Sequence, residues 1–211
     1  MKCLKKKVIC ACCNNEVQQN LPIEDPLKEK CLDGYQDGVE KYFRLNECPH
    51  CHYVAYNLSQ AEPEVQNSVG SYAYQEILKE DNSVFRRLKL LAFIADETYD
   101  IYGQAEAYLN LYWYSNEQGW NSNNYLQRTI GIYKKICDDD YCDPQDMITL
   151  IDLIRQDGNL KEAEDLARDF IDKVSSYDDI NDRQALQKYI DMAKQELEYI
   201  EIGDINSHYR R

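Results

Sequence analysis

Residues 143–174, DPQDMITLIDLIRQDGNLKEAEDLARDFIDKV, predict two α-helices joined by a short turn. Asp143 is suited to cap the first helix, and Pro144 to take its first position, where no backbone N–H group needs a partner. Gly158 is suited to end that helix, because glycine readily adopts the left-handed conformation of a helix C-terminus. Apolar side chains recur at steps of three and four on both sides of the turn. The stretch therefore predicts an antiparallel helix pair.

The same helical spacing extends over most of the chain from about residue 64 onwards. Four further segments precede the pair and one follows it, and each carries an apolar stripe on one face. Such stripes are typical of helices that pack on a common core. In the second segment the stripe continues through Tyr99 and Tyr102. The segments are residues 65–77, 85–102, 105–113, 126–137 and 186–200.

The N-terminal part has a different pattern, in which two Cys-x-x-Cys pairs stand out. Cys10 and Cys13 form the first pair, and Cys48 and Cys51 form the second. Two thiolates spaced in this way can face one ion from a tight turn, and two such turns complete a tetrahedron of four sulfur ligands. We therefore predict a Zn²⁺ site at these four residues. Because four cysteines leave no open coordination position, the zinc is expected to be structural.

The residues around the pairs predict a zinc ribbon made of two β-hairpins. Val8 and Ile9 lead into the first pair, and residues 39–45, VEKYFRL, lead into the second with a composition typical of strands. Pro49 fixes the backbone at the second turn. The metal would fold a segment that has little apolar core of its own.

Other interpretations of the cysteines remain open at this stage. A redox pair would require a strand, the motif and then a helix, whereas turn-forming asparagines follow Cys13. Cys12, His50 or His52 lies close enough in sequence to replace a cysteine in the tetrahedron. Cys3 and Cys31 fit no pairing and are predicted to be bystanders.

Two further cysteines, Cys137 and Cys142, bracket the acidic residues Asp138, Asp139 and Asp140. Such a cluster suggests calcium. However, the spacing lacks the glycine and the distal glutamate of an EF-hand loop. We predict an acidic loop between two helices.

The distribution of charged residues changes near residue 60, where the cysteine-rich part is followed by the helical part. Residues 1–60 hold eight basic and eight acidic side chains, whereas residues 61–211 hold 16 and 30 and so account for the whole formal charge of −14. We therefore predict a zinc-ribbon module over residues 1–60 and a helical domain over residues 61–211. The expected fold class is mainly α, with a small N-terminal β zinc ribbon.

Residues 158–163, GNLKEA, with Ala167 four residues further on, resemble the turn and second helix of a tetratricopeptide repeat. The small Ala163 and Ala167 would let two helix backbones approach closely. Phe170 differs from the alanine that this repeat usually has. The resemblance implies an antiparallel, tetratricopeptide-like array of helices.

The order of motifs carries a wider resemblance. Residues 48–53, CPHCHY, follow a first Cys-x-x-Cys pair and precede residues 105–113, AEAYLNLYW. In this order the chain resembles a bacterial family of uncharacterised proteins with an N-terminal zinc ribbon and tetratricopeptide-like helices. His52 departs from the glycine that more often follows the second pair. The family has no assigned activity to carry over.

The sequence favours a cytoplasmic protein without catalytic activity. The apolar stretch after the N-terminal lysines is too short for a secretory signal, and no stretch reaches the roughly 18 apolar residues of a membrane span. Cysteines clustered in a reducing compartment are more often metal ligands than disulfides. The nucleotide-binding glycine motifs and the zinc-protease motif are absent, and the three histidines lie at positions 50, 52 and 208.

These features favour an adaptor or scaffold that offers an acidic, tyrosine-rich groove to a protein partner with a basic or neutral surface. The chain contains 18 tyrosines, which supply contact area with few rotatable bonds, although they equally suit the helix interfaces. A nucleic-acid-associated zinc ribbon is the second hypothesis, and a zinc-dependent enzyme is the third.

The charge distribution predicts that nucleic acid does not bind. Four thiolates and one Zn²⁺ sum to −2, so only the short run Lys5, Lys6 and Lys7 could contact phosphates, whereas useful affinity requires several such contacts. Titration against labelled DNA and RNA at about 150 mM salt should show no saturable binding. Sub-micromolar binding under these conditions would favour the second hypothesis instead.

Overall fold

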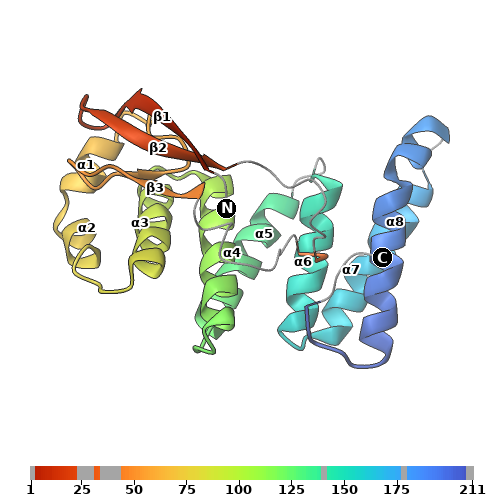
Figure 1. Cartoon of the computed structure of the whole chain (residues 1–211). Helices are drawn as coiled ribbons and strands as arrows, with labels where there is room; N and C mark the ends of the chain where they lie inside the picture. The colour runs from red at the N-terminus through yellow and green to blue at the C-terminus, as the bar shows by residue number, and fades with distance from the viewer. Residues whose placement is uncertain (1–2, 23–30, 34–43, 139–141, 177–179, 208–211) are drawn as a thin grey trace. The chain divides into compact units, whose positions relative to one another are not determined.

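The computed structural model describes residues 3–22, 31–33, 44–138, 142–176 and 180–207. It is mainly helical with a small N-terminal β part, which confirms the predicted fold class (Figure 1). None of the helices in these ranges has the length and apolar character needed to cross a membrane. The strands are β1 (Cys3–Ile9), β2 (Glu16–Pro22), β3 (Asn46–Glu47) and β4 (Val54–Ala55). The helices are α1 (Val65–Gly70), α2 (Tyr72–Ile77), α3 (Ser83–Glu97), α4 (Ile101–Glu117), α5 (Asn123–Cys137), α6 (Pro144–Gln156), α7 (Leu160–Ser175) and α8 (Ile180–Glu201).

By packing, the chain forms two compact units. Unit 1 comprises the described residues of Met1–Leu27 and Asp37–Ser122, and unit 2 those of Lys28–Gln36 and Asn123–Arg211. The strands are followed by helices from about residue 60, which is where we predicted the boundary between modules 1–60 and 61–211. The boundary between the two packing units instead lies after residue 122. Independent folding of those two modules stays a prediction.

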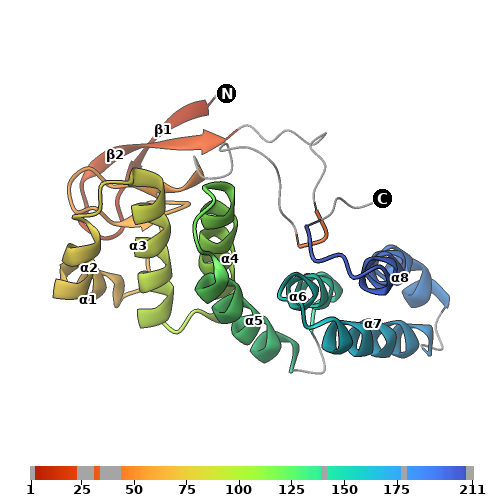
Figure 2. The same ribbon diagram turned by 90° about the horizontal axis from the view of Figure 1, so that it is seen from below.

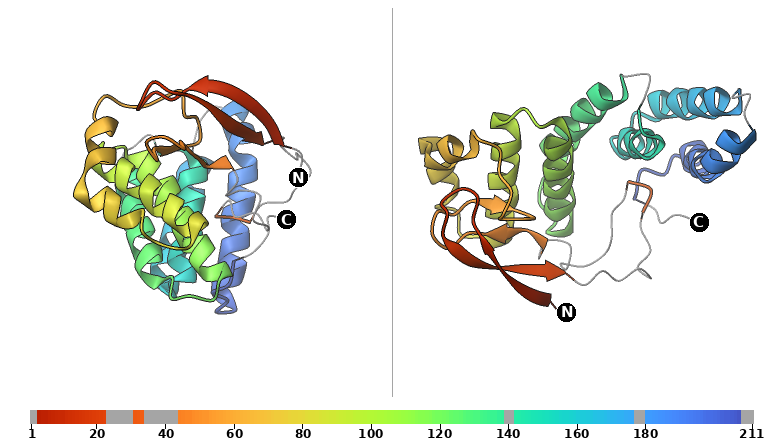
Figure 3. Two further views of the ribbon diagram at one scale, coloured as in Figure 1. Left: turned by 60° about the vertical axis from the view of Figure 1, so that its left-hand side comes forward. Right: turned by 90° about the horizontal axis from the view of Figure 1, so that it is seen from above.

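Unit 1 contains the two predicted hairpins. Strands β1 and β2 pair antiparallel with Val8 opposite Val17, and β3 and β4 pair with Glu47 opposite Val54 (Figure 3). Asn46 joins the hairpins, because its side-chain oxygen accepts from the Asn20 N–H at 2.8 Å and its amide nitrogen donates to the Asn20 carbonyl at 3.2 Å. Helices α3 and α4 pack against each other, and α3 also contacts β4. Residues 39–43 of the predicted second strand lie outside the described residues.

Two predicted helical segments are interrupted in unit 1. Residues 65–77 form two short helices because the backbone of Ser71 is extended, and its hydroxyl accepts from the Tyr74 N–H to start α2. The stripe over 85–102 ends at Tyr99, which has a left-handed backbone with φ of 55°. Asp100 then caps α4, so that Tyr99 and Tyr102 are exposed rather than part of the core. The predicted continuous stripe was wrong here, because a side-chain cap overrides the helical spacing.

Unit 2 confirms the predicted helix pair and its signals. The Asp143 carboxylate accepts from the Gln145 N–H at the start of α6, and Gly158 adopts φ of 85° after its end. Ala163 and Ala167 are completely buried, which lets α7 lie close to α6. Helices α6, α7 and α8 pack on one another (Figure 2).

A segment from the N-terminal part also belongs to unit 2. Leu32 is completely buried there, and its carbonyl accepts from the Gln145 side chain at 3.4 Å. Asp33 is 2% exposed and lies 3.4 Å from the side-chain nitrogen of Gln156. The chain between the two cysteine pairs therefore contributes to the core of the second unit, which the sequence patterns did not indicate.

A buried ionic cluster lies at the centre of unit 2. The Arg155 guanidinium donates to Glu196 at 2.6 Å and to Asp152, and all three side chains are fully buried. Arg155 also donates to the carbonyls of Asp204 and Asn206, which fixes the segment after α8. Burial, only partly opposed by Arg155, raises the pKa of Glu196 to about 7. The free-energy cost of ionising several buried carboxyl groups around one guanidinium at the same time is high.

Replacing Glu196 by glutamine should reduce the pH dependence of stability. A carboxyl group whose pKa is raised by folding stabilises the protein below its unfolded pKa and loses that contribution as pH rises through about 7. The free energy of unfolding of Glu196→Gln, relative to that of the native protein, should therefore increase by at most ~3 kcal/mol between about pH 5 and pH 8. The melting temperature of the variant should rise relative to that of the native protein over the same range. Circular dichroism at a series of pH values measures this difference.

The matched control is Glu198→Gln, which changes an exposed carboxylate on the same helix. Its melting temperature should follow that of the native protein across the series. A difference for Glu196→Gln that stays constant or shrinks as pH rises would contradict the assigned pKa.

Candidate metal centre

The first cysteine pair lies in the turn between β1 and β2. The Cys10 carbonyl accepts from the Asn14 N–H at 2.8 Å, and the Cys10 N–H donates to the Asn15 carbonyl at 2.9 Å. These two bonds close a tight loop in which Asn14 has a left-handed φ of 60°. Asparagine tolerates this conformation better than most residues. The local sequence therefore fixes the direction of both thiols.

The second pair repeats this geometry between β3 and β4. The Cys48 carbonyl accepts from the His52 N–H at 2.9 Å, and the Cys48 N–H donates to the Tyr53 carbonyl at 2.8 Å. His52 has φ of 63°, at the position equivalent to Asn14. The departure from glycine at His52 thus leaves the turn intact. Its imidazole is held 2.9 Å from a carboxylate oxygen of Glu47.

The two turns bring the four predicted sulfur ligands together. The Sγ atoms of Cys10, Cys13, Cys48 and Cys51 all lie within 4.8 Å of one another. Across the two turns, Cys10 lies 3.8 Å from Cys51, and Cys13 lies 3.7 Å from Cys48. Ligands about 2.3 Å from a central zinc ion, at the corners of a regular tetrahedron, lie about 3.8 Å from one another. The spacing is therefore that of a four-coordinate metal site, and this group can hold a metal ion.

The electrostatics of the group favour a cation at its centre. Burial raises the pKa of Cys10 to about 11 and also raises that of Cys51. Burial acts in the same direction at Cys13, but hydrogen bonds from the backbone and side chain of Asn15 outweigh it and lower the pKa to about 6. Thiols so close together resist ionising as a group unless a positive charge compensates them.

The other sequence candidates lie outside this group. Cys12 is 7% exposed and its backbone carbonyl accepts from Gln66, whereas His50 is exposed to solvent. Cys31 is buried in unit 2. The side chain of Cys3 and all of His208 lie outside the described residues. Among the described residues, the group of possible metal ligands contains cysteines alone.

Several residues that support the turns were not predicted from the sequence. Tyr74 on α2 donates its hydroxyl to the His52 carbonyl at 2.8 Å, and its side chain is fully buried. On α3, Arg87 donates to the Leu45 carbonyl at 2.8 Å and Arg86 pairs with Glu47 at 3.0 Å. All of these contacts lie within unit 1. They attach the second cysteine turn to helices that follow it in the sequence, and no local pattern signals such contacts.

Comparisons with protein families, with curated proteins and with solved structures find no match to this chain. The resemblance to a bacterial zinc-ribbon family therefore stays a prediction.

The geometry predicts opposite effects for two cysteine substitutions. Cys48→Ser removes a completely buried member of the group, so the purified protein should lose the single zinc ion that we predict here, and the hairpins should loosen. Cys31→Ser changes a buried thiol of unit 2 and should leave the zinc bound. Elemental analysis with circular dichroism as a folding check measures both, and full zinc occupancy in Cys48→Ser would exclude the assignment.

Proposed function

We propose that the protein is a non-catalytic adaptor in which a structural zinc ion at the four cysteines shapes a binding groove for a basic protein segment. Zinc is the metal that a tetrahedral set of four thiolates suits best. The observation that carries the proposal is a hollow in unit 1 whose wall begins at the metal centre.

This hollow, the ribbon groove, has a volume of about 660 Å³. One wall is formed by the segment that follows the second cysteine turn, and the other by α3 and the start of α4. Two tyrosines and three carboxylates line it, and no lysine or arginine does so among the described lining residues. These tyrosines and carboxylates are Tyr53, Tyr56, Glu62, Asp100 and Glu106.

The carboxylates give the groove a negative charge that a basic segment would neutralise. Burial raises the pKa of Glu106 and the nearby Asp100 raises it further, whereas a hydrogen bond with Tyr56 and the charge of Arg44 oppose this rise. The side chain of Asn110 lies 3.4 Å from the Tyr56 hydroxyl and helps to fix that ring. A lysine or arginine in the groove would stabilise the ionised form of Glu106 and would be bound more tightly for that reason.

The metal centre and the groove wall are directly connected. The N–H group of Ala11, within the first cysteine pair, donates to the Leu58 carbonyl at 2.8 Å. Tyr53 follows the second pair, and its hydroxyl donates to the Gln60 carbonyl at 2.8 Å. Loss of the ion would release both turns and, with them, the segment from Tyr53 to Glu62. A structural metal would thereby control binding without taking part in any reaction.

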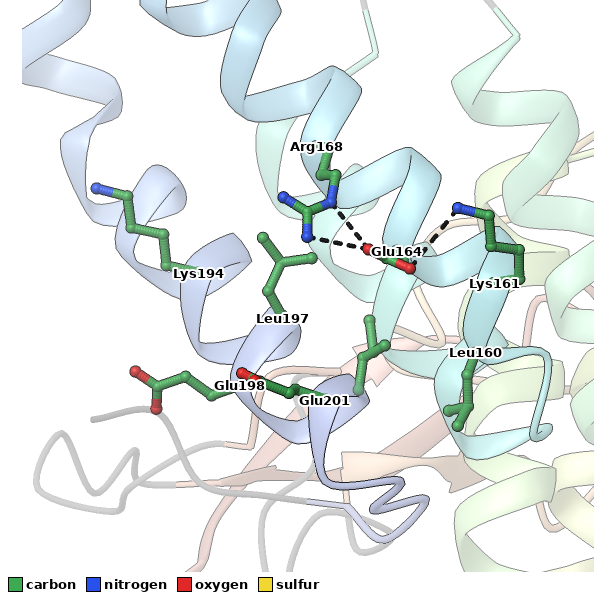
Figure 4. Close-up of a pocket in the computed structure, with 9 residues that line it drawn as sticks. Leu160, Lys161, Glu164, Arg168, Lys194, Leu197, Glu198 and Glu201 are labelled. Atoms are coloured by element: carbon green, nitrogen blue, oxygen red, sulfur yellow. Dashed lines mark hydrogen bonds and ion pairs between the residues drawn. The ribbon is translucent and has the colours of Figure 1, made fainter.

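A second hollow, between α7 and α8, is less suited to a charged partner (Figure 4). Its charged side chains are three basic and three acidic. On α7, Glu164 pairs with Arg168 at 2.9 Å and lies 3.7 Å from Lys161. The ribbon groove therefore has the more one-sided charge.

Most tyrosines with described side chains are not available for recognition. The buried ones are Tyr53, Tyr74, Tyr108, Tyr112, Tyr114, Tyr133 and Tyr199, as the interpretation of tyrosines as interface filler predicts. The tyrosine contribution to binding would come from the half-buried Tyr56 in the groove, together with Tyr99 and Tyr102, which are 89% and 61% exposed.

The proposal predicts a charge-selective and metal-dependent affinity for peptides. The zinc-loaded protein should retain peptides from a basic pool of a random library and not from an acidic pool. The combined substitution of Glu62→Gln, Asp100→Asn and Glu106→Gln should weaken binding of a retained peptide about tenfold or more, since it removes three charges and keeps the cap of α4. Fluorescence anisotropy of the labelled peptide measures the affinity.

The matched control replaces the three carboxylates of the hollow between α7 and α8, by Glu164→Gln, Glu198→Gln and Glu201→Gln. This variant has the same net charge as the groove variant, and its affinity should be close to that of the native protein. Removal of zinc by a chelator should abolish binding. Equal weakening in both variants would show a general charge effect and would exclude the groove as the binding site.

A further inference from the structure

The last two cysteines of the chain form a close pair in unit 2. Cys137 ends α5, and Cys142 directly precedes Asp143, which caps α6. Their sulfur atoms lie 2.6 Å apart. Both thiols are partly exposed, so that reagents can reach them. The sequence indicated an acidic loop here, of which Asp139 and Asp140 lie outside the described residues.

The pair lies beside a small hollow built from the helices of the same unit. Its volume is about 150 Å³, and both thiols line it. Helices α6, α7 and α8 contribute an apolar lining, Lys173 supplies a positive charge, and Asp169 supplies a negative one. The apolar lining residues are Pro144, Met147, Leu166, Phe170, Val174 and Leu186.

The two thiols differ in acidity in a way that suits different roles. The hydrogen bond between the sulfurs lowers the pKa of Cys142 and outweighs burial and the charges of Asp146 and Asp143, which raise it, while the charge of Lys173 lowers it further. The same contact, together with burial, raises the pKa of Cys137. Cys142 is therefore the thiol that ionises first and the better nucleophile of the two at neutral pH.

We propose that Cys137 and Cys142 form a thiol–disulfide exchange site for low-molecular-weight aliphatic disulfides, with the apolar hollow receiving the methylene groups next to the reacting sulfur. This site is separate from the metal centre and independent of the proposed adaptor function. It lies in the other unit, and the possible metal-ligand group among the described residues does not include these two cysteines.

The reaction proceeds in two balanced steps. The Cys142 thiolate attacks one sulfur of the small disulfide, whose S–S bond breaks as a mixed disulfide forms, and the first small thiol leaves with the proton that Cys142 gave up. The Cys137 thiol then loses its proton and attacks the Cys142 sulfur, which releases the second small thiol. The two protein thiols are oxidised to a disulfide, and the reagent is reduced to two thiols. Because the two sulfurs already lie 2.6 Å apart, the second step needs little rearrangement of the chain.

The experiment uses the zinc-loaded full-length protein in a buffer of glutathione and glutathione disulfide. Samples are quenched with acid, the remaining thiols are alkylated, and the peptides are identified by mass spectrometry. The native protein should accumulate the Cys137–Cys142 disulfide while its zinc content stays constant. Cys137→Ser should instead stop at a mixed disulfide with glutathione on Cys142. Cys142→Ser should leave Cys137 as unreactive as the buried Cys31 in the same sample.

A pair of lysine substitutions tests the role of the charge. Lys173→Met should slow the first step about threefold, since it removes the charge that favours the thiolate. Lys161→Met changes an exposed lysine on the same helix and should have no effect on this rate. Circular dichroism of every variant checks that the fold is kept.

Two results would overturn the proposal. In the first, the native protein retains a stable mixed disulfide on Cys142, so that Cys137 does not complete the exchange. In the second, the pair reacts no faster than Cys31, which would make both residues ordinary packed thiols.

Discussion

The contact of four sulfur atoms at the separation of a tetrahedral metal site is the constraint on which unit 1 depends. The hairpins bury few apolar side chains of their own, so a bound metal ion would supply much of the energy that holds them together. The burial that raises the pKa of Cys10 and Cys51 works against four thiolates without a cation. The same burial favours binding of a cation, which compensates all four charges at once.

The effect of a bound ion would extend beyond the hairpins, because helices of unit 1 are attached to the second cysteine turn and its strand by specific hydrogen bonds. Tyr74 holds the second turn from α2, and Arg87 reaches the strand before it from α3. The first turn is bonded to Leu58, in the segment that forms the groove wall. The ion would therefore set the shape of the ribbon groove, although none of its four cysteine ligands lines that groove. In this way a metal site without an open coordination position could support binding of a partner without catalysis.

The features predicted correctly from the sequence are those encoded within a few residues. The spacing within each cysteine pair fixes its turn, and Asp143 and Gly158 bound α6 through local backbone chemistry. The sequence prediction was wrong where a local cap interrupts a regular stripe, as at Ser71 and Asp100. The burial of residues 31–33 in unit 2 and the Arg155 cluster depend on partners distant in sequence, so no periodicity could indicate them. For the same reason the position of the ribbon groove could not be predicted from local patterns.

X-ray absorption at the zinc edge of the purified full-length protein tests the central claim most directly. The account predicts one zinc ion per chain, with four sulfur neighbours at about 2.3 Å and no nitrogen or oxygen in the first shell. A first shell containing nitrogen or oxygen would mean that a histidine or water replaces a cysteine and that the site is open. A protein that retains no metal while unit 1 stays folded would contradict the account altogether.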